Sequence, residues 1–355
     1  MPKDSRTSEQ RAAERRAKID ALHERLTASV EGLVTGDDWR RAMEFGTRFR
    51  SRSFRNSRLI EVQHLEAYNL GMVPHPFPTY VAGFRQWQSL GRPVIKGSHS
   101  YQIFAPVTGR FASTTPTDTS SWRRLARGER PHPGEAVRSK IVGVKLAHVF
   151  DVSMTAGDPL PEVPQPKVLV GEAPDGLWDG LADQITERGY GLRLVSNRAA
   201  IGGANGITDH LNRAVSVRVD MDEAAMVKTA AHELAHVIQG LQNVDGPMHR
   251  GIAEVEAESV ALMIGAAHGM DTSDYTIPYV ATWADRVPGR SPVEVVQATA
   301  ERVRGIATTI LDKLDTPKIN DGAPPGLDRT APAPTNSTDA IRPLTSTRPS
   351  EAIGL

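Results

Sequence analysis

Apolar residues recur at every third or fourth position in several long segments, the spacing that places them on one face of an amphipathic helix. One of these segments opens on Ser291-Pro292-Val293-Glu294, a capping box with proline at the first helical position. The first segment is dense in Ala, Arg and Glu and carries one apolar stripe at Ile19, Leu22, Leu26, Val30 and Leu33. Helices are predicted over residues 7–33, 39–50, 174–188, 222–241, 253–265 and 291–314.

Shorter segments with β-branched and aromatic residues predict strands between these helices. They are residues 79–84, 100–107, 140–152 and 214–219. A proline-rich stretch at 159–166 marks the expected domain boundary, and the Pro, Thr and Ser-rich end predicts disorder. The predicted fold is α+β: a charged N-terminal helix (1–38), an α+β domain (39–158), a linker (159–172), a mainly helical domain (173–315) and a disordered tail (316–355).

Composition limits the compartment and the available ligands. With 355 residues the chain is long enough for two domains that each bury a core. It has no Cys, which excludes disulfides and thiolate metal ligands. No run approaches the roughly 18 apolar residues of a membrane span, and the N-terminus is charged rather than a signal peptide. We therefore expect a cytoplasmic protein with no membrane contact.

The formal net charge of zero hides a strong asymmetry. Between Arg40 and Lys145 there are 18 Lys and Arg against 6 Asp and Glu, so the rest of the chain is acidic. All 8 Phe also fall between Trp39 and Phe150. This composition is typical of proteins that bind single-stranded nucleic acid, because cations follow the phosphates and rings stack on unpaired bases. The alternative needs no DNA: the aromatic residues lie in a core and the charges are solvated.

Two arginine clusters sharpen the nucleic-acid interpretation. Arg48, Arg50, Arg52, Arg55 and Arg58 crowd around two phenylalanines. Phe84 and Trp87 are candidates for base stacking, with core packing as the alternative. A second basic cluster lies in a Pro, Ser and Thr-rich stretch that predicts a mobile loop over residues 109–140. Its members are Arg123, Arg124, Arg127, Arg130, Arg138 and Lys140.

The pentapeptide His232-Glu233-Leu234-Ala235-His236 predicts a zinc site. Residues four apart share one face of a helix, so two imidazoles can bind one metal ion while Glu233 reaches the metal-bound water. An ordinary amphipathic helix with two histidines is the alternative. The helix formers that follow a capping Asp222, with Gly240 as a stop, favour a helix that carries the motif.

A catalytic zinc usually has three protein ligands, so a third residue is needed. The helix predicted over 253–265 begins with three alternating carboxylates, of which Glu254 and Glu258 share a face. Glu254 is the expected ligand and Glu258 the alternative. Glu256 points elsewhere and is expected to be solvated or to support the ligands. His249 and His268 are expected to be ordinary surface residues.

The ligand types indicate peptide hydrolysis. Zinc lowers the pKa of its bound water to about 7, Glu233 accepts the proton as general base, and the metal polarises the scissile carbonyl. Tyr275 and Tyr279 are the nearest candidates by sequence for a donor to the oxyanion, although a core role with a bonded hydroxyl is the alternative.

Four segments in this order resemble the N-terminal domain of ArdC-type antirestriction proteins, a single-stranded DNA-binding module. They are residues 53–60, 81–92, 96–97 and 149–152. The part that follows is similar to the zinc metallopeptidase domain of the same family, a zincin-like (gluzincin-type) fold related to ImmA/IrrE peptidases. The resemblance covers roughly residues 39–283, and the arginine-rich stretch at 109–140 and the long tail depart from it.

This resemblance implies a DNA-binding activity and the residues of a metal site. It places zinc on His232, His236 and Glu254, with Glu233 as the base. The candidate DNA-contacting residues, chosen for their charge or aromatic ring in the basic first part, are Arg48, Arg50, Arg52, Arg55, Arg58, Phe84, Arg85, Trp87, Arg92 and Lys96.

Three functions are compatible with the sequence. The leading one is a single-stranded DNA-binding antirestriction protein of a plasmid or phage that carries a zinc peptidase-type domain. A second is a regulatory zinc metalloprotease that cleaves a DNA-associated protein substrate. A third is a DNA-coating protein in which the zinc is structural. Substitution of Glu233 by Gln separates them, since only catalysis needs that carboxylate.

Overall fold

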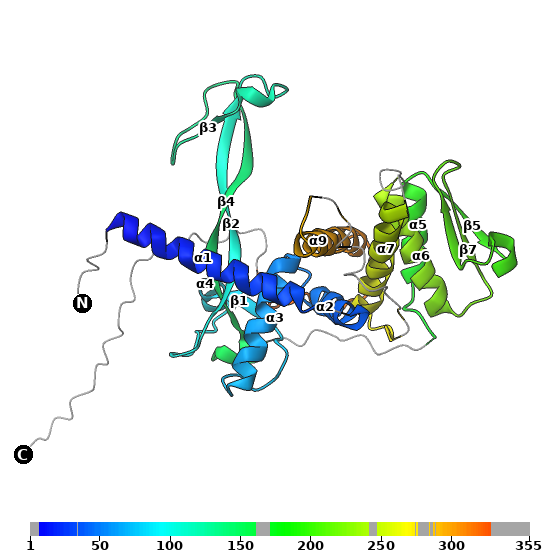
Figure 1. Cartoon of the computed structure of the whole chain (residues 1–355), viewed down its shortest axis with the longest axis horizontal. Helices are drawn as coiled ribbons and strands as arrows, with labels where there is room; N and C mark the ends of the chain where they lie inside the picture. The colour runs from blue at the N-terminus through cyan, green and yellow to red at the C-terminus, as the bar shows by residue number, and fades with distance from the viewer. Residues whose placement is uncertain are drawn as a thin grey trace, which may run out of the picture.

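Two sheets and a set of helices make up the described part of the fold (Figure 1). The helices are α1 (Ser8–Glu31), α2 (Gly36–Arg48), α3 (Phe54–Asn69), α4 (Phe84–Ser89), α5 (Leu177–Glu187), α6 (Glu223–Gln239), α7 (Pro247–Ala267) and α9 (Pro292–Leu311). The strands are β1 (Val81–Gly83), β2 (Tyr101–Ser113), β3 (Arg123–Arg124), β4 (Ala136–Asp151), β5 (Gly191–Val195), β6 (Gly206–Asp209) and β7 (Ala214–Arg218). The computed structural model describes residues 7–33, 35–160, 171–240, 247–273, 275, 284, 287 and 289–327.

The elements confirm the α+β class, and local capping explains where three helices begin. Thr7, Thr35 and Ser291 each accept a hydrogen bond from the backbone three residues on, and the side chain found there returns the bond. Because Thr35 caps α2, this helix begins before the predicted residue 39. No described helix has the length and apolar content needed to cross a membrane.

The first sheet is antiparallel, with strand order β1-β4-β2-β3. Its long ribbon runs from the pair Tyr101 and Val149 to the pair Ser113 and Ala136, with an irregularity between Val107 and Thr108. The prediction of a loop over 109–140 is therefore wrong at both ends. Ladder hydrogen bonds continue through these residues even though Gly, Ser and Arg obscure the strand pattern. The far half of the ribbon projects from the helices in Figure 1.

One hydrophobic core joins the N-terminal helices to the later ones. Leu22 and Leu26 from α1 and Trp39 from α2 are buried in the same cluster as residues of α5, α6, α7 and α9. The Trp39 Nε1 atom donates a hydrogen bond to Ser259 Oγ in α7 at 2.9 Å. The core thus has members from both sides of the predicted linker, of which residues 161–170 lie outside the described part. The division into two domains stays a prediction.

A second, smaller core lies between α2, α3 and the first sheet. Phe49 and Ile60 pack there against Tyr101, Ile103 and Val149, all buried. The next side chain on β2, Phe104, is buried in the larger core, so both faces of the strand are covered here. The helices therefore cover the near half of the ribbon.

Part of the predicted tail is ordered. Residues 316–327 pack onto the N-terminal part, where the Val81 amide donates to the Gly322 carbonyl at 2.9 Å. Gly322 has a φ of 81°, and a Cβ atom there would lie 2.3 Å from the ring of Phe49. The prediction of disorder from residue 316 is wrong for this segment. Backbone hydrogen bonds and the close approach of Gly322 to Phe49 hold it in place, and neither gives the apolar periodicity from which order is predicted. Residues 328–355 lie outside the described part.

The second sheet has strand order β5-β7-β6. β5 pairs with β7 in parallel, and β6 pairs with β7 in antiparallel orientation. Only β7 was expected from the sequence. Strand β6 lies at one edge and contacts α6, so the sheet lies beside the helix that carries the two histidines.

Candidate metal centre and basic surface

Helix α6 presents the two histidines on one face. Asp222 caps the start of the helix, where its carboxylate accepts a hydrogen bond from the Ala225 amide at 2.7 Å, and Gly240 caps the end. The Nε2 atoms of His232 and His236 lie 3.1 Å apart. This separation is compatible with two nitrogens at about 2.0–2.1 Å from one zinc ion.

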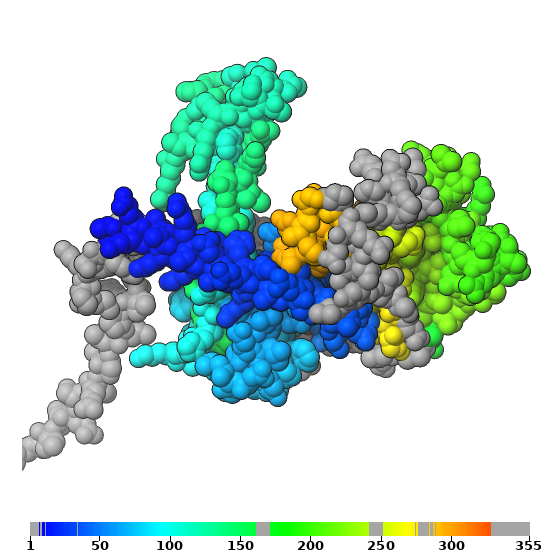
Figure 2. Space-filling model, viewed as in Figure 1, coloured from blue at the N-terminus to red at the C-terminus, as the bar shows by residue number. Residues whose placement is uncertain are grey.

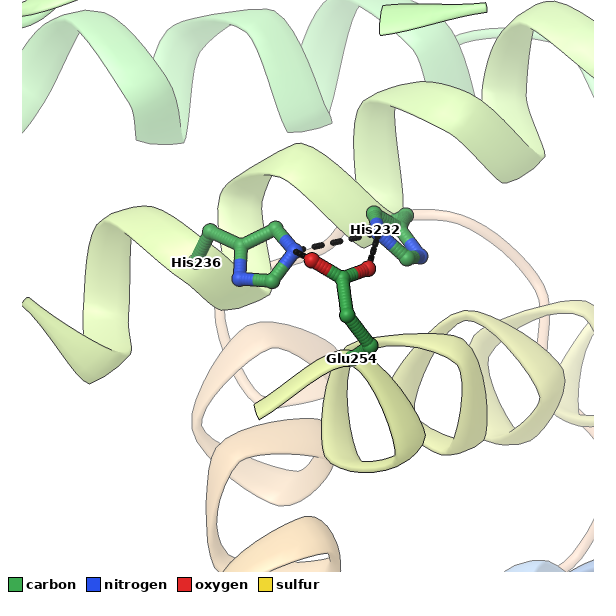
Figure 3. A group of neighbouring side chains, drawn as sticks. All are labelled: His232, His236 and Glu254. Carbon is green, nitrogen blue, oxygen red and sulfur yellow. Dashed lines mark hydrogen bonds and ion pairs between the residues drawn. The ribbon is translucent and has the colours of Figure 1, made fainter. Parts of the chain in front are cut away.

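Glu254 from α7 faces both imidazoles (Figure 3). One carboxylate oxygen lies 3.3 Å from Nε2 of His232, and the other lies 3.6 Å from Nε2 of His236. One ligand atom from each of the three residues falls within 4.8 Å of the other two. A metal ion could therefore be held by two helix α6 nitrogens and one helix α7 carboxylate, as the HExxH spacing predicts.

Glu258 contacts the opposite nitrogen of His232. Its Oε2 lies 3.3 Å from Nδ1, and its Oε1 lies 2.7 Å from the Lys228 ammonium. A carboxylate on Nδ1 orients the ring and leaves Nε2 for a metal. The geometry thus favours Glu254 as the ligand and gives Glu258 a supporting contact.

A second chain of contacts holds His236. Its Nδ1 lies 3.0 Å from Oε1 of Gln239, an acceptor, so this contact favours a proton on Nδ1 and leaves Nε2 directed at His232 and Glu254. The Gln239 amide nitrogen faces Glu256 at 3.3 Å, and Arg302 of α9 donates to Glu256 at 2.6 Å. Glu256 is 1% exposed. It therefore supports the histidine rather than facing solvent.

Glu233 lies beside the three ligand atoms without joining them. Its side chain is 5% exposed, and the Thr208 hydroxyl of β6 donates to Oε2 at 2.6 Å. A Cβ atom on Gly206 would lie 2.8 Å from Oε1 of Glu233, so glycine permits this close approach of β6 to α6. Strand β6 therefore positions the carboxylate.

The charged groups of the site shift one another's pKa. Burial disfavours the charged form of His232, but hydrogen bonds to Glu254 and Glu258 outweigh it and raise its pKa to about 9. Hydrogen bonds from both histidines lower the pKa of Glu254. Burial raises the pKa of Glu233, although the bond from Thr208 opposes it. The site therefore favours a bound positive charge near Glu254.

These groups line a cleft of about 800 Å³ between α6, α7 and the β6 region. The Glu254 side chain is 62% exposed, so the ligand cluster faces solvent. His210, which sequence reasoning missed, also lines the cleft, and its Nδ1 lies 2.8 Å from the Tyr190 hydroxyl. Burial lowers its pKa. The one sequence signal that could have identified His210 is its position directly after β6. Strand β6 was not predicted, so this signal was missed.

Other candidate residues lie elsewhere. Tyr275 is buried, its hydroxyl lies 3.4 Å from the Ala261 carbonyl, and it does not line the cleft. The alternative of a core residue with a bonded hydroxyl is therefore confirmed, and Tyr275 is not an oxyanion donor. Its long apolar ring fills the core instead. His268 is fully buried between Ile264 and Thr316 rather than on the surface. Tyr279 and the side chain of His249 lie outside the described part.

Several predicted DNA contacts are used inside the protein. Arg52 donates to the Val81 carbonyl at 2.7 Å, and burial lowers its pKa. The other guanidinium groups likewise donate to backbone carbonyls that need partners: Arg50 to Asn320, Arg58 to Ser29 and Arg92 to Gly157. Trp87 is fully buried and donates to Phe150, so its prediction as a stacking residue is wrong.

The remaining predicted DNA contacts reach solvent. Arg48, Arg55, Arg85 and Lys96 are exposed. Phe84 is 53% exposed and meets Phe150 edge-on. The basic and aromatic composition of the first part is therefore divided between internal bonds and an accessible surface.

Residues 17–150 match the model of the N-terminal domain of anti-restriction factor ArdC. The chain carries an ArdC N-terminal domain. The matched residues include the later part of α1, all of α2 to α4 and almost all of the first sheet. The metal centre lies after it, and the predicted kinship of the second part with ImmA/IrrE peptidases stays a prediction.

Relatives are similar over longer stretches than the ArdC N-terminal domain alone. The uncharacterized protein pXO2-81 of Bacillus anthracis is 24% identical over 328 residues, 87% of this chain and 53% of its own. The chain thus spans about half the length of that relative. Crystal structures of the antirestriction ArdC protein from plasmid R388, metal-free and Mn(II)-bound, are 17% and 15% identical, with TM-scores of 0.43 and 0.42. Both alignments cover 73% of this chain. They cover 84% of the metal-free ArdC chain and 83% of the Mn(II)-bound one.

Proposed function

We propose that the chain binds single-stranded DNA through its ArdC N-terminal domain and carries a zinc peptidase-type centre, and that it protects plasmid or phage DNA from restriction. The family match over residues 17–150 supports the antirestriction role. The excess of cations and the exposed positions of Arg48, Arg55, Arg85 and Lys96 support DNA contact.

The proposed catalytic zinc site depends on one observation: the cleft holds three possible metal ligands and, beside them, a separate carboxylate that could act as the base. His232, His236 and Glu254 offer three ligand atoms, while Glu233 is buried beside them and bonded to Thr208. Structural zinc sites are usually closed by four protein ligands, whereas catalytic sites have three and an open position. Two imidazoles and a carboxylate suit zinc. The donor set and the open cleft thus support a catalytic zinc site.

Each protein group has a defined task in this proposal. When bound, zinc would supply an acidified water and polarise a carbonyl. Glu233 accepts the proton of that water, and its raised pKa brings it closer to the operating pH of a general base. Thr208 holds the carboxylate in place. His210 faces the same cleft and is a candidate donor to the oxyanion.

An extended peptide fits the cleft as substrate. Strand β6 is at the edge of its sheet, and Gly206, Ile207 and Thr208 line the cleft. An unpaired strand edge binds an extended peptide through main-chain hydrogen bonds. A protein substrate associated with DNA would then be brought to the centre by the first domain, which is the regulatory-protease alternative.

The test compares wild type, Glu233→Gln and Glu254→Gln. Zinc content is measured by mass spectrometry, binding of a labelled single-stranded oligonucleotide by fluorescence anisotropy, and hydrolysis with a peptide library. We expect wild type and Glu233→Gln to bind DNA and one zinc, with hydrolysis lost in Glu233→Gln. Glu254→Gln should lose zinc and still bind DNA.

The alternatives predict other outcomes. A structural zinc gives no hydrolysis by either protein, and loss of zinc in Glu254→Gln then lowers stability. A salt-independent interaction with the oligonucleotide contradicts DNA binding, because log affinity should fall by about 0.7 per neutralised phosphate as log salt rises.

A further inference from the structure

The far half of the β2/β4 ribbon, with the residues that join its strands, forms an arm (residues 108–141). Figure 2 shows it standing clear of the helices. The ladder continues without further irregularity from Thr108 to Ser113 on β2, and β3 adds a short third strand at the far end. Two faces of this ribbon therefore reach solvent, and the register determines which side chains share each face.

One face is both basic and aromatic. Phe111 lies opposite Arg138 on β4 and Arg124 on β3, and Lys140 lies opposite Gly109, two positions away on the same side. The guanidinium carbon of Arg138 lies 3.9 Å from the centre of the Trp122 ring, so Trp122 belongs to this side too. We call this set the arm face: Phe111, Trp122, Arg124, Arg138 and Lys140.

Gly109 leaves room for the arm face. A Cβ atom at this position would lie 3.2 Å from the Phe111 ring and 3.4 Å from Nε of Arg124. Without that atom, the ring and the guanidinium lie low across the ribbon. Phe111 and Trp122 are half-buried, so part of each ring remains accessible.

The cations of the arm face are available to a ligand. The acidic residues Glu129 and Glu135 both bond to Arg123, which lies on the opposite face beside Ala112. Within the described residues, no ion pair is present for Arg124, Arg138 or Lys140, and all three are exposed. The arm face thus presents three uncompensated positive charges around two rings.

We propose that the arm face binds single-stranded DNA. This inference rests on the proposed function and assigns DNA contact to a defined surface. The sequence grouped Arg124, Arg138 and Lys140 in a predicted basic loop, whereas the strand register places them on one face with two rings. Cations follow the phosphates of a flexible strand while its unstacked bases meet the rings. A two-stranded ribbon also fits the major groove of a duplex, but paired bases are stacked on each other and leave Phe111 without a partner. The rings therefore favour the single strand.

The test uses charge-matched variants on the two faces. Arg110 lies on β2 next to Phe111, and its exposed side chain is on the face opposite the arm face. Arg110→Gln is therefore the control for Arg124→Gln and Lys140→Gln. Phe111→Leu removes the ring and keeps an apolar side chain over Gly109. Anisotropy titrations with a single-stranded oligonucleotide and the matching duplex, at several salt concentrations, follow a circular-dichroism check of folding.

We expect Arg124→Gln and Lys140→Gln each to weaken single-strand binding and to reduce the salt slope by about 0.7. Phe111→Leu should lower affinity about five-fold or more at unchanged slope. Arg110→Gln should retain most of the affinity. Wild-type binding that survives all arm-face variants overturns this inference alone. Equal losses in Arg110→Gln, or preference for the duplex, also overturn it. Absence of binding by wild type contradicts the proposed function itself.

Discussion

The ion pair between Arg302 and Glu256 supports the proposed metal ligand His236 from a distance, and Arg302→Leu tests this support. The substitution keeps an apolar stem but removes the charge that faces Glu256 at 2.6 Å. Glu256 is 1% exposed, and its remaining side-chain contact is Gln239 at 3.3 Å. A buried carboxylate without its cation is costly, so the variant should be less stable.

The magnitude depends on how much solvent reaches the pair. Loss of one partner from a fully buried pair costs about 3–5 kcal/mol. The Arg302 side chain is 47% exposed, and screening reduces this value to about 1–3 kcal/mol. Burial already raises the pKa of Glu256, and loss of Arg302 raises it further. A carboxyl whose pKa is raised on folding destabilises the protein as pH rises above its unfolded value of about 4.3. The loss should therefore be larger at pH 7.5 than at pH 5.

Two assays check this prediction. Urea unfolding followed by circular dichroism gives the free energy at both pH values, and competition with a chelating dye gives zinc affinity. Affinity should fall about ten-fold, because Glu256 is no longer held by Arg302 and orients Gln239, and through it His236, less well. Lys313→Leu is the control, since its pair with Glu187 is exposed and should matter little. Equal stability loss in both variants, with unchanged zinc affinity, refutes the reasoning.

Three further predictions concern packing and protonation. Gly206→Ala should cost about 1–3 kcal/mol in urea unfolding and slow any hydrolysis, because the new methyl group displaces Glu233; unchanged values would contradict the close approach. Trp39→Ala should cost about 3–5 kcal/mol and remove the bond to Ser259, and a single unfolding transition is expected because the core is continuous. Zinc affinity measured from pH 7 to 9 should rise about ten-fold per unit and then level off, since His232, with a pKa of about 9, must lose a proton to bind. Without zinc, the stabilising contribution of protonated His232 is complete below about pH 6.5 and is lost as pH rises through 9; a flat affinity profile contradicts the assignment.

Local sequence patterns predicted the long helices, and they predicted the residues that the structure brings together in the candidate metal centre. The spacing of His232 and His236 on a helix is a local property, so it could be found without a structure. The same holds for the face that Glu254 and Glu258 share. Which carboxylate faces the Nε2 atoms depends on how α7 packs on α6, and that packing is a property of the whole core.

Features that depend on distant contacts were missed. Strand β6 is four residues long and carries Thr208, whose bond to Glu233 links positions 25 residues apart. The internal roles of Arg52 and Arg92 follow from carbonyl groups brought near them by folding. The strands of the arm were not predicted, because the sequence around Gly109 and its neighbouring arginines does not alternate between apolar and polar residues as a half-buried strand does.

Calorimetric titration of zinc into the chelator-treated chain tests the central claim most directly, with wild type, Glu254→Gln and Glu258→Gln compared at one pH. The account predicts one zinc per wild-type chain and no detectable binding in Glu254→Gln. In Glu258→Gln the zinc affinity should fall about 10- to 100-fold, because Glu258 orients His232 without binding the metal itself. Wild-type affinity in Glu254→Gln, or a greater loss in Glu258→Gln, would contradict it.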